Sequence, residues 1–259
     1  MYKNNKPLFE AGKILKIQML EELRDFNRDY LDIRYEEYTD GIIKGCAIEI
    51  YDNFISIRDG IIKYNNIIYL LKGEEKISYV SNNKYMMLKV RFSDSSKKDD
   101  FQFNLSEVFL DENLNLASNE MEICRFKLRD GSRLRGDYID YTDLSTEFDT
   151  VNVIHTIYAG KGQWTVSPKL TQEFGKELLK YNLENPWDIS FALMCVQANE
   201  PISRDIIMTY IKNKINLDDR FYSNMEIYNH LLQILNTIKN TGSSNGATNR
   251  RRQRRILID

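Results

Sequence analysis

The strongest constraint on this chain is a repeated pentapeptide. Asp-Gly-Ile-Ile-Lys occurs at residues 40–44 and again at 59–63, and each copy leads into a stretch rich in Ile and Tyr. Glycine can adopt the positive φ of a tight turn, and isoleucine favours the pleated surface of a half-buried strand. The repeat therefore predicts two consecutive hairpin-like units of one small all-β module. No third copy follows, which argues against a repeat-built solenoid.

Alternation of apolar and polar residues continues to about residue 129. Examples are Ile55-Ser-Ile57, Leu88-Lys-Val-Arg-Phe92 and Phe101-Gln-Phe-Asn-Leu105, separated by Asn- and Ser-rich turn signals. This period of two predicts an antiparallel β-sandwich or barrel with one solvated face over residues 40–130. The polar stretch 93–100 is expected to be a hairpin tip or surface loop.

An amphipathic helix is predicted ahead of the β module, within residues 1–39. Between Leu8 and Tyr30 apolar residues recur at helical spacing, and acidic and basic residues occupy the other side. The helix has two interpretations: it packs on its own domain, or it docks on a neighbouring subunit. The second interpretation assigns partner binding to Leu8, Leu15, Met19, Leu23 and Phe26.

The second half of the chain predicts helices. Residues 131–165 are irregular, with turn character near Gly131 and a possible irregular helix over 143–155, and are assigned to a hinge region. Residues 166–240 have helical periodicity, with the cap pair Ser167-Pro168, a helix opening at Pro186 and a cap at Ser203. These elements predict a compact helical bundle. The predicted fold class is therefore α+β.

Residues 241–259 form a separate C-terminal arm. A spacer low in apolar residues, 241–249, precedes a basic and then apolar segment. Partner binding is assigned here to Arg250, Arg251, Arg252, Arg254, Arg255, Ile256, Leu257 and Ile258. The alternatives are a solvated tail and a nucleic-acid contact. Against nucleic acid, no aromatic residue is interleaved for base stacking, and the whole chain has a net charge of −2.

The motifs for catalysis, cofactors and metals are weak, and no catalytic, cofactor-binding or metal-binding residue is assigned. Gly160-Lys-Gly162 lacks the spacing of a phosphate-binding loop. His155 and His230 lie in apolar contexts that favour structural roles, and the three cysteines, which have no zinc-ligand spacing, are expected to be buried thiols. One enzymatic alternative stays open: two of the carboxylates between Asp137 and Asp149 could form a glycosidase pair.

The expected compartment is a reducing cytoplasm. The N-terminal sequence has no apolar region of a secretory signal, and no apolar run approaches the roughly 20 residues of a membrane span. Any extracellular role would then begin with another route of release, such as lysis.

Four segments together resemble a family. They are Gly12-Lys-Ile-Leu15, Tyr38-Thr-Asp-Gly-Ile-Ile-Lys-Gly-Cys46, Ile57-Arg-Asp-Gly-Ile-Ile-Lys-Tyr64 and Asn119-Glu-Met-Glu-Ile-Cys-Arg-Phe-Lys-Leu128. The chain resembles, over nearly its full length, tail-module proteins of clostridial prophages and contractile phage-tail-like bacteriocins. Relatives sometimes carry a helicase label, but this chain has no helicase motif.

The resemblance implies a non-enzymatic structural subunit of a baseplate or tail-fibre attachment. Its implied partners are other baseplate or tail proteins and possibly a tail fibre, in multiple copies per particle, with no nucleic acid and no membrane insertion. Such a particle assembles in the bacterial cytoplasm and is released by lysis. The alternatives are a tail-associated cell-wall hydrolase and a nucleic-acid-binding protein that uses the arginine-rich arm.

Overall fold

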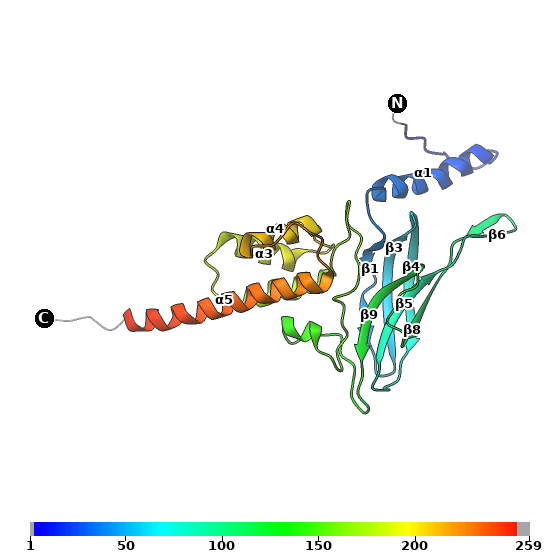
Figure 1. Cartoon of the computed structure of the whole chain (residues 1–259). Helices are drawn as coiled ribbons and strands as arrows, with labels where there is room; N and C mark the ends of the chain where they lie inside the picture. The colour runs from blue at the N-terminus through cyan, green and yellow to red at the C-terminus, as the bar shows by residue number, and fades with distance from the viewer. Residues whose placement is uncertain (1–2, 253–259) are drawn as a thin grey trace.

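The computed structural model describes residues 3–252, and the side chains of residues 3–240. It is a mixed α+β protein with an N-terminal helix, antiparallel sheets and C-terminal helices, which confirms the predicted fold class. Figure 1 shows helix α1 above the sheets and helices α3 to α5 to the left of them. The elements that precede residue 131 are α1 (Ile17–Tyr35), β1 (Gly41–Gly45), β2 (Ile48–Ile50), β3 (Phe54–Tyr64), β4 (Ile67–Ser78), β5 (Tyr85–Phe92), β6 (Ser96–Lys98), β7 (Phe101–Phe103), β8 (Ser106–Asp111) and β9 (Glu120–Lys127).

The two copies of the repeat pair with each other. The first copy forms β1 and the second lies inside β3, in antiparallel register with Gly41 opposite Lys63 and Gly45 opposite Gly60. The prediction of a turn at the second copy is therefore wrong. Gly60 follows a register shift within β3, and a Cβ there would lie 2.2 Å from the Cys46 sulfur. The glycine is required by this close approach rather than by a turn.

The first sheet is built around β3. Strands β1 and β2 lie along one edge of β3, and β4 covers the other edge along its whole length. The β3–β4 hairpin turns at Asn65 and Asn66, whose φ values of 48° and 61° fit a two-residue loop with both central residues in the left-handed region. The Asn-Asn turn signal is thus confirmed.

The second sheet has the order β8-β5-β9 and packs against the first. Aromatic side chains join the two layers: Tyr64 of β3 stacks on Phe92 of β5 with ring centroids 4.1 Å apart, and Tyr69 of β4 meets the same ring at 4.9 Å. Buried Ile55, Ile57, Leu88 and Val90 belong to the core between the sheets. The alternation thus produces two facing apolar layers, as in a sandwich.

The connector of residues 131–165 contains one short 3-10 helix, η1 (Tyr141–Ser145), and otherwise extended or turn backbone. The possible helix over 143–155 is limited to this turn, because Asp149 has a φ of 63° and the following residues form isolated bridges such as Arg125–Asn152. Leu144 and Ile154 are fully buried. The segment assigned to a hinge is therefore packed into the core.

Four α-helices follow the connector: α2 (Pro168–Leu178), α3 (Pro186–Gln197), α4 (Arg204–Lys214) and α5 (Asn224–Arg252). Two of these starts agree with the sequence prediction: α2 begins after the cap pair Ser167-Pro168, and α3 opens at Pro186. The Ser167 hydroxyl accepts from the Lys169 N–H, and the Asn185 amide oxygen accepts from the Trp187 N–H. The side chain of Ser203, by contrast, makes no capping hydrogen bond at the start of α4.

Helix α5 begins with a reciprocal capping box. The Ser223 hydroxyl accepts from the Glu226 N–H, while the Glu226 carboxylate accepts from the Ser223 N–H at 2.8 Å. The helix continues to Arg252, so the predicted spacer over 241–249 differs from the structure, which is helical there. Once a helix is nucleated, each further residue adds one hydrogen bond, which allows extension into a sequence of weak helix formers.

Candidate interaction site

Helix α1 presents an apolar stripe that the rest of the described structure leaves uncovered. None of its 19 residues is buried. Large apolar side chains exposed along it are Ile17, Leu20, Leu23, Phe26, Tyr30 and Ile33. At 3.6 residues per turn, Leu23, Phe26, Tyr30 and Ile33 lie within an arc of about 80° on one side of the helix, while Ile17 and Leu20 lie further round it. A contiguous exposed apolar surface of this kind is typical of a binding site for another protein.

Three of the five predicted docking residues lie on α1, and the other two precede it. Leu23 and Phe26 lie on α1 and are both 51% exposed, and Met19 is half-buried. Leu8 and Leu15 are exposed but precede the helix, which starts at Ile17 rather than near Leu8. The helix starts late because Gly12 has a φ of 83°, a left-handed conformation incompatible with a continuous right-handed helix.

The C-terminal end of α1 is fixed to the first sheet by Lys63. This side chain is 3% exposed, and its ammonium group donates to the carbonyl oxygens of Tyr35 at 2.7 Å, Glu36 at 3.2 Å and Tyr38 at 2.7 Å. The last carbonyls of a helix have no partners within the helix, and a cation there also complements the helix dipole. The anchor thus holds one end of α1 and leaves its apolar stripe accessible.

The predicted C-terminal binding residues fall at and beyond the limit of the described chain. Arg250, Arg251 and Arg252 are in the last turn of α5, and their side chains are not described. Arg254, Arg255, Ile256, Leu257 and Ile258 lie outside the described residues. Figure 1 shows α5 pointing away from the sheets, so its end is well separated from α1.

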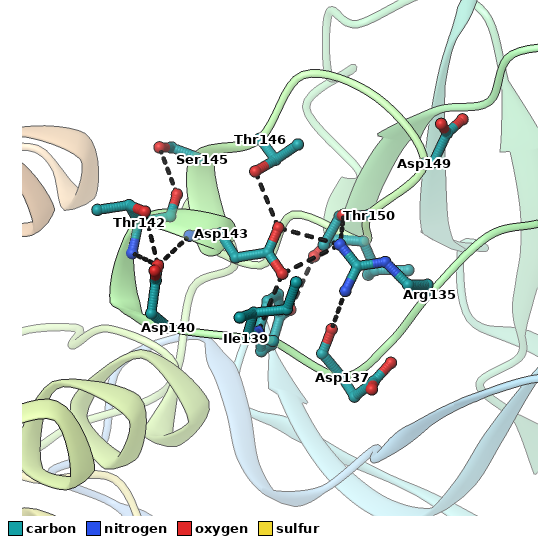
Figure 2. Close-up of polar contacts among 12 residues, drawn as sticks. Arg135, Asp137, Ile139, Asp140, Thr142, Asp143, Ser145, Thr146, Asp149 and Thr150 are labelled. Carbon is teal, nitrogen blue, oxygen red and sulfur yellow. Dashed lines mark hydrogen bonds and ion pairs between the residues drawn. The ribbon is translucent and has the colours of Figure 1, made fainter.

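Three carboxylates of the connector, those of Asp140, Asp143 and Asp149, make hydrogen bonds and ion pairs within the fold. Figure 2 shows Asp143 facing Arg135, whose guanidinium donates to both carboxylate oxygens at 3.1 Å. Thr146 and the Ile139 N–H also donate to Asp143. Asp140 caps η1 by accepting from the N–H groups of Thr142 and Asp143. Asp149, drawn apart from this group, pairs with Arg129.

These contacts lower the pKa values of three connector carboxyls. Burial by itself would raise the pKa of Asp143, but hydrogen bonds from Ile139, Thr146 and Arg135 outweigh it, and the net pKa is lowered. The pKa of Asp149 is also lowered, because the contacts with Arg129 outweigh desolvation. The Thr142 hydrogen bond lowers the pKa of Asp140. A glycosidase acid needs a raised pKa, so none of the three has the property of that acid.

The histidines and cysteines have structural surroundings. Burial lowers the pKa of His155, which favours the neutral ring. Burial raises the pKa of Cys46 to about 11 and that of Cys195 to about 12. All three cysteines are free and buried, as predicted, and a thiol with a raised pKa is a poor nucleophile. Within residues 3–252, no three His, Cys, Asp or Glu side chains gather into a potential metal site.

Two further apolar surfaces were not predicted as interaction sites. On α3 and α4 the exposed residues are Trp187, Ile189, Leu193, Met194, Val196 and Ile206. Helix α3 is apolar around its whole circumference, which is a signal in the sequence for contacts on more than one side. The other surface is the β6–β7 hairpin, which projects from the sheets in Figure 1. Its Phe101 and Phe103 are exposed, and so is Leu105 just after it, although their alternation resembles that of a core strand.

No helix in the described part of the chain combines the length and apolarity needed to cross a bilayer.

Comparisons with known proteins give distant structural likenesses. No family model and no curated protein matches the sequence. A structure titled "Crystal structure of TssK" aligns with a TM-score of 0.39 and 9% identity over 93% of this chain and 72% of that one. A chain of the type VI secretion system TssK-TssF-TssG baseplate subcomplex aligns with a TM-score of 0.39 and 10% identity, covering 91% and 99% of the two chains. A chain of a type VI secretion baseplate complex gives 0.36 and 10%, covering 92% and 99%. TM-scores below 0.5 do not establish a shared fold, so these likenesses assign neither function nor partners.

Proposed function

We propose that this chain is a structural, non-enzymatic subunit of a contractile phage-tail-like particle. In this role it is a baseplate component that connects neighbouring baseplate subunits or receptor-binding fibres. The observation that carries the proposal is α1, a helix whose apolar stripe is uncovered and whose C-terminal end is anchored by Lys63. An anchored helix with a free apolar face is suited to docking in a groove of another protein.

The sequence resemblance to tail-module proteins of clostridial prophages and bacteriocins supplies the kind of particle. The resembling segments 38–46, 57–64 and 119–128 contain β1, much of β3 and β9. They are framework residues, as the contact between Gly60 and Cys46 illustrates. The resemblance therefore concerns how the subunit is built, while α1 supplies a surface for assembly.

The proposal also includes the setting of the subunit. It is made and assembled in the bacterial cytoplasm, is present in several copies per particle, and leaves the cell by lysis. Its partners are other baseplate or tail proteins, with a tail fibre as one of them.

The decisive experiment measures incorporation of variants into particles. Leu23→Asp/Phe26→Asp is expressed in place of the wild-type chain, and sedimented particles are quantified for the subunit. Because both side chains are 51% exposed, the free protein should fold normally. Loss of two central apolar contacts should reduce incorporation by at least about tenfold.

The matched control is Val80→Asp/Ile139→Asp, which places the same charges at apolar positions that are 73% and 77% exposed and lie outside α1. The control should enter particles normally. Normal incorporation of the α1 variant would contradict the assigned surface, and absence of the wild-type chain from particles would refute the proposed function. Deletion of residues 241–259 separately tests whether the C-terminal arm contributes.

A further inference from the structure

The sandwich has an open groove between two strand edges. Strand β4 pairs with β3 and strand β8 pairs with β5, and within residues 3–252 no strand pairing joins β4 to β8. A groove of about 870 Å³ lies between them and reaches inward to Ile57 and Ile123. The two free edges therefore border an elongated depression rather than a closed seam.

The groove has an apolar floor and an acidic rim. Ile62, Leu71 and Val108 line it and are partly buried against the core. Glu75 of β4 and Glu107 of β8 line it from opposite edges. In the described part of the chain Glu75 makes no ion pair, and Glu107 has only a contact of 3.9 Å with Arg91 while 68% exposed. An extended segment with apolar and basic residues fits this chemistry.

We propose that residues 254–258 of one copy bind in the β4–β8 groove of a second copy. The segment is Arg254-Arg255-Ile256-Leu257-Ile258. In an extended chain Ile256 and Ile258 project to the same side, where they can cover the apolar floor. The arginines that precede them supply positive charge for Glu75 and Glu107. Strand addition along β4 or β8 would at the same time satisfy the free backbone groups of that edge.

The bound segment must come from another copy, because residues 254–258 cannot reach the β4–β8 groove of their own chain. Helix α5 starts beside the sheets, where the Asn224 side chain donates to the Thr156 carbonyl at 2.9 Å. Its 29 residues span about 43 Å, and Figure 1 shows the helix leading away from the sheets. The seven residues 253–259 extend at most about 25 Å, so they cannot return along the helix to the groove of the same chain.

The contact is heterologous, because the arm and the groove are different surfaces. Such a contact links copies head to tail, into a ring if the rotation closes and into an open chain if it does not. This self-association goes beyond the proposed function and is tested on the purified chain without any particle.

The test is a charge swap in the full-length chain, followed by sedimentation velocity over a range of concentrations. Wild-type protein should self-associate. Glu75→Lys/Glu107→Lys and Arg254→Glu/Arg255→Glu should each weaken association by about tenfold or more, because attraction becomes repulsion. A chain that carries all four substitutions should recover association to within about threefold of wild type.

The matched control is Asp130→Lys/Glu184→Lys, which changes the net charge equally at two exposed carboxylates that lie away from the groove lining. It should associate as wild type does. A monomeric wild-type chain, an unchanged Glu75/Glu107 variant or a failed recovery would each overturn the proposal. Hydrogen exchange of the wild-type chain gives a second readout that needs no variant: β4 and β8 amides should become protected as concentration rises, and unchanged exchange there would also overturn it.

Discussion

The contacts of Asp143 in the connector make the stability of the fold depend on pH. Its side chain is 9% exposed and receives hydrogen bonds from Arg135, Thr146 and the Ile139 N–H. Burial raises its pKa, but these contacts outweigh burial and hold it below the ordinary value of 3.8. The unfolded chain therefore binds a proton at higher pH than the folded chain does, and the stabilisation is present above about pH 4 and is lost on further acidification.

Asp143→Asn should remove this stabilisation. The substitution keeps the size of the side chain but weakens its charged hydrogen bonds, so we expect a loss of about 2 kcal/mol in the free energy of unfolding at pH 7. The difference from wild type should shrink as the pH falls below about 4. Urea unfolding at a series of pH values measures both effects, and a difference that is constant over this range would contradict the assignment.

At the scale of elements, Lys63 decides how α1 is held. It corresponds to Lys44 in the other copy of the repeat. Lys44, however, is 59% exposed, and among the described residues its ammonium group pairs with Glu200 at 3.5 Å. Lys63→Met should uncap three carbonyls and lower the free energy of unfolding by about 2 kcal/mol. The matched control Lys44→Met should change it by less than about 0.5 kcal/mol. Hydrogen exchange should show faster exchange in α1 for Lys63→Met, and equal effects of the two substitutions would refute the anchoring role.

The elements differ in how far local sequence determines them. Caps at Ser167 and Asn185 and the Asn65-Asn66 turn depend on nearby residues, so these features follow from the sequence. The pairing of the two repeat copies depends on a register shift and on the approach of Gly60 to Cys46, which are contacts distant in sequence. The β4–β8 groove was not predicted either. It forms between two strands that are distant in sequence and do not pair with each other. The α1 stripe was predicted from periodicity, although its exposure required the structure.

At the scale of the whole molecule, the connector joins the β-sheets and helices in one core. Leu144 is fully buried, and Tyr141 stacks on Tyr228 of α5 with ring centroids 4.9 Å apart. On the sheet side, the Thr156 hydroxyl donates to the Ile123 carbonyl of β9 at 2.7 Å. The buried residues on both sides belong to one hydrophobic cluster that runs from the sheets through the connector to α5, so the two halves should unfold together.

Leu144→Ala tests this coupling because the substituted side chain lies in the connector and belongs to the core that the sheets and helices share. The cavity should cost about 2–5 kcal/mol. The loss should appear equally in tryptophan fluorescence, which reports on Trp164 and Trp187, and in hydrogen exchange of β5. Leu116→Ala, at a position that is 43% exposed, is the control and should cost less than about 1 kcal/mol. If Leu144→Ala destabilised the helices while β5 kept its protection, the two halves would unfold independently, which would contradict the single shared core.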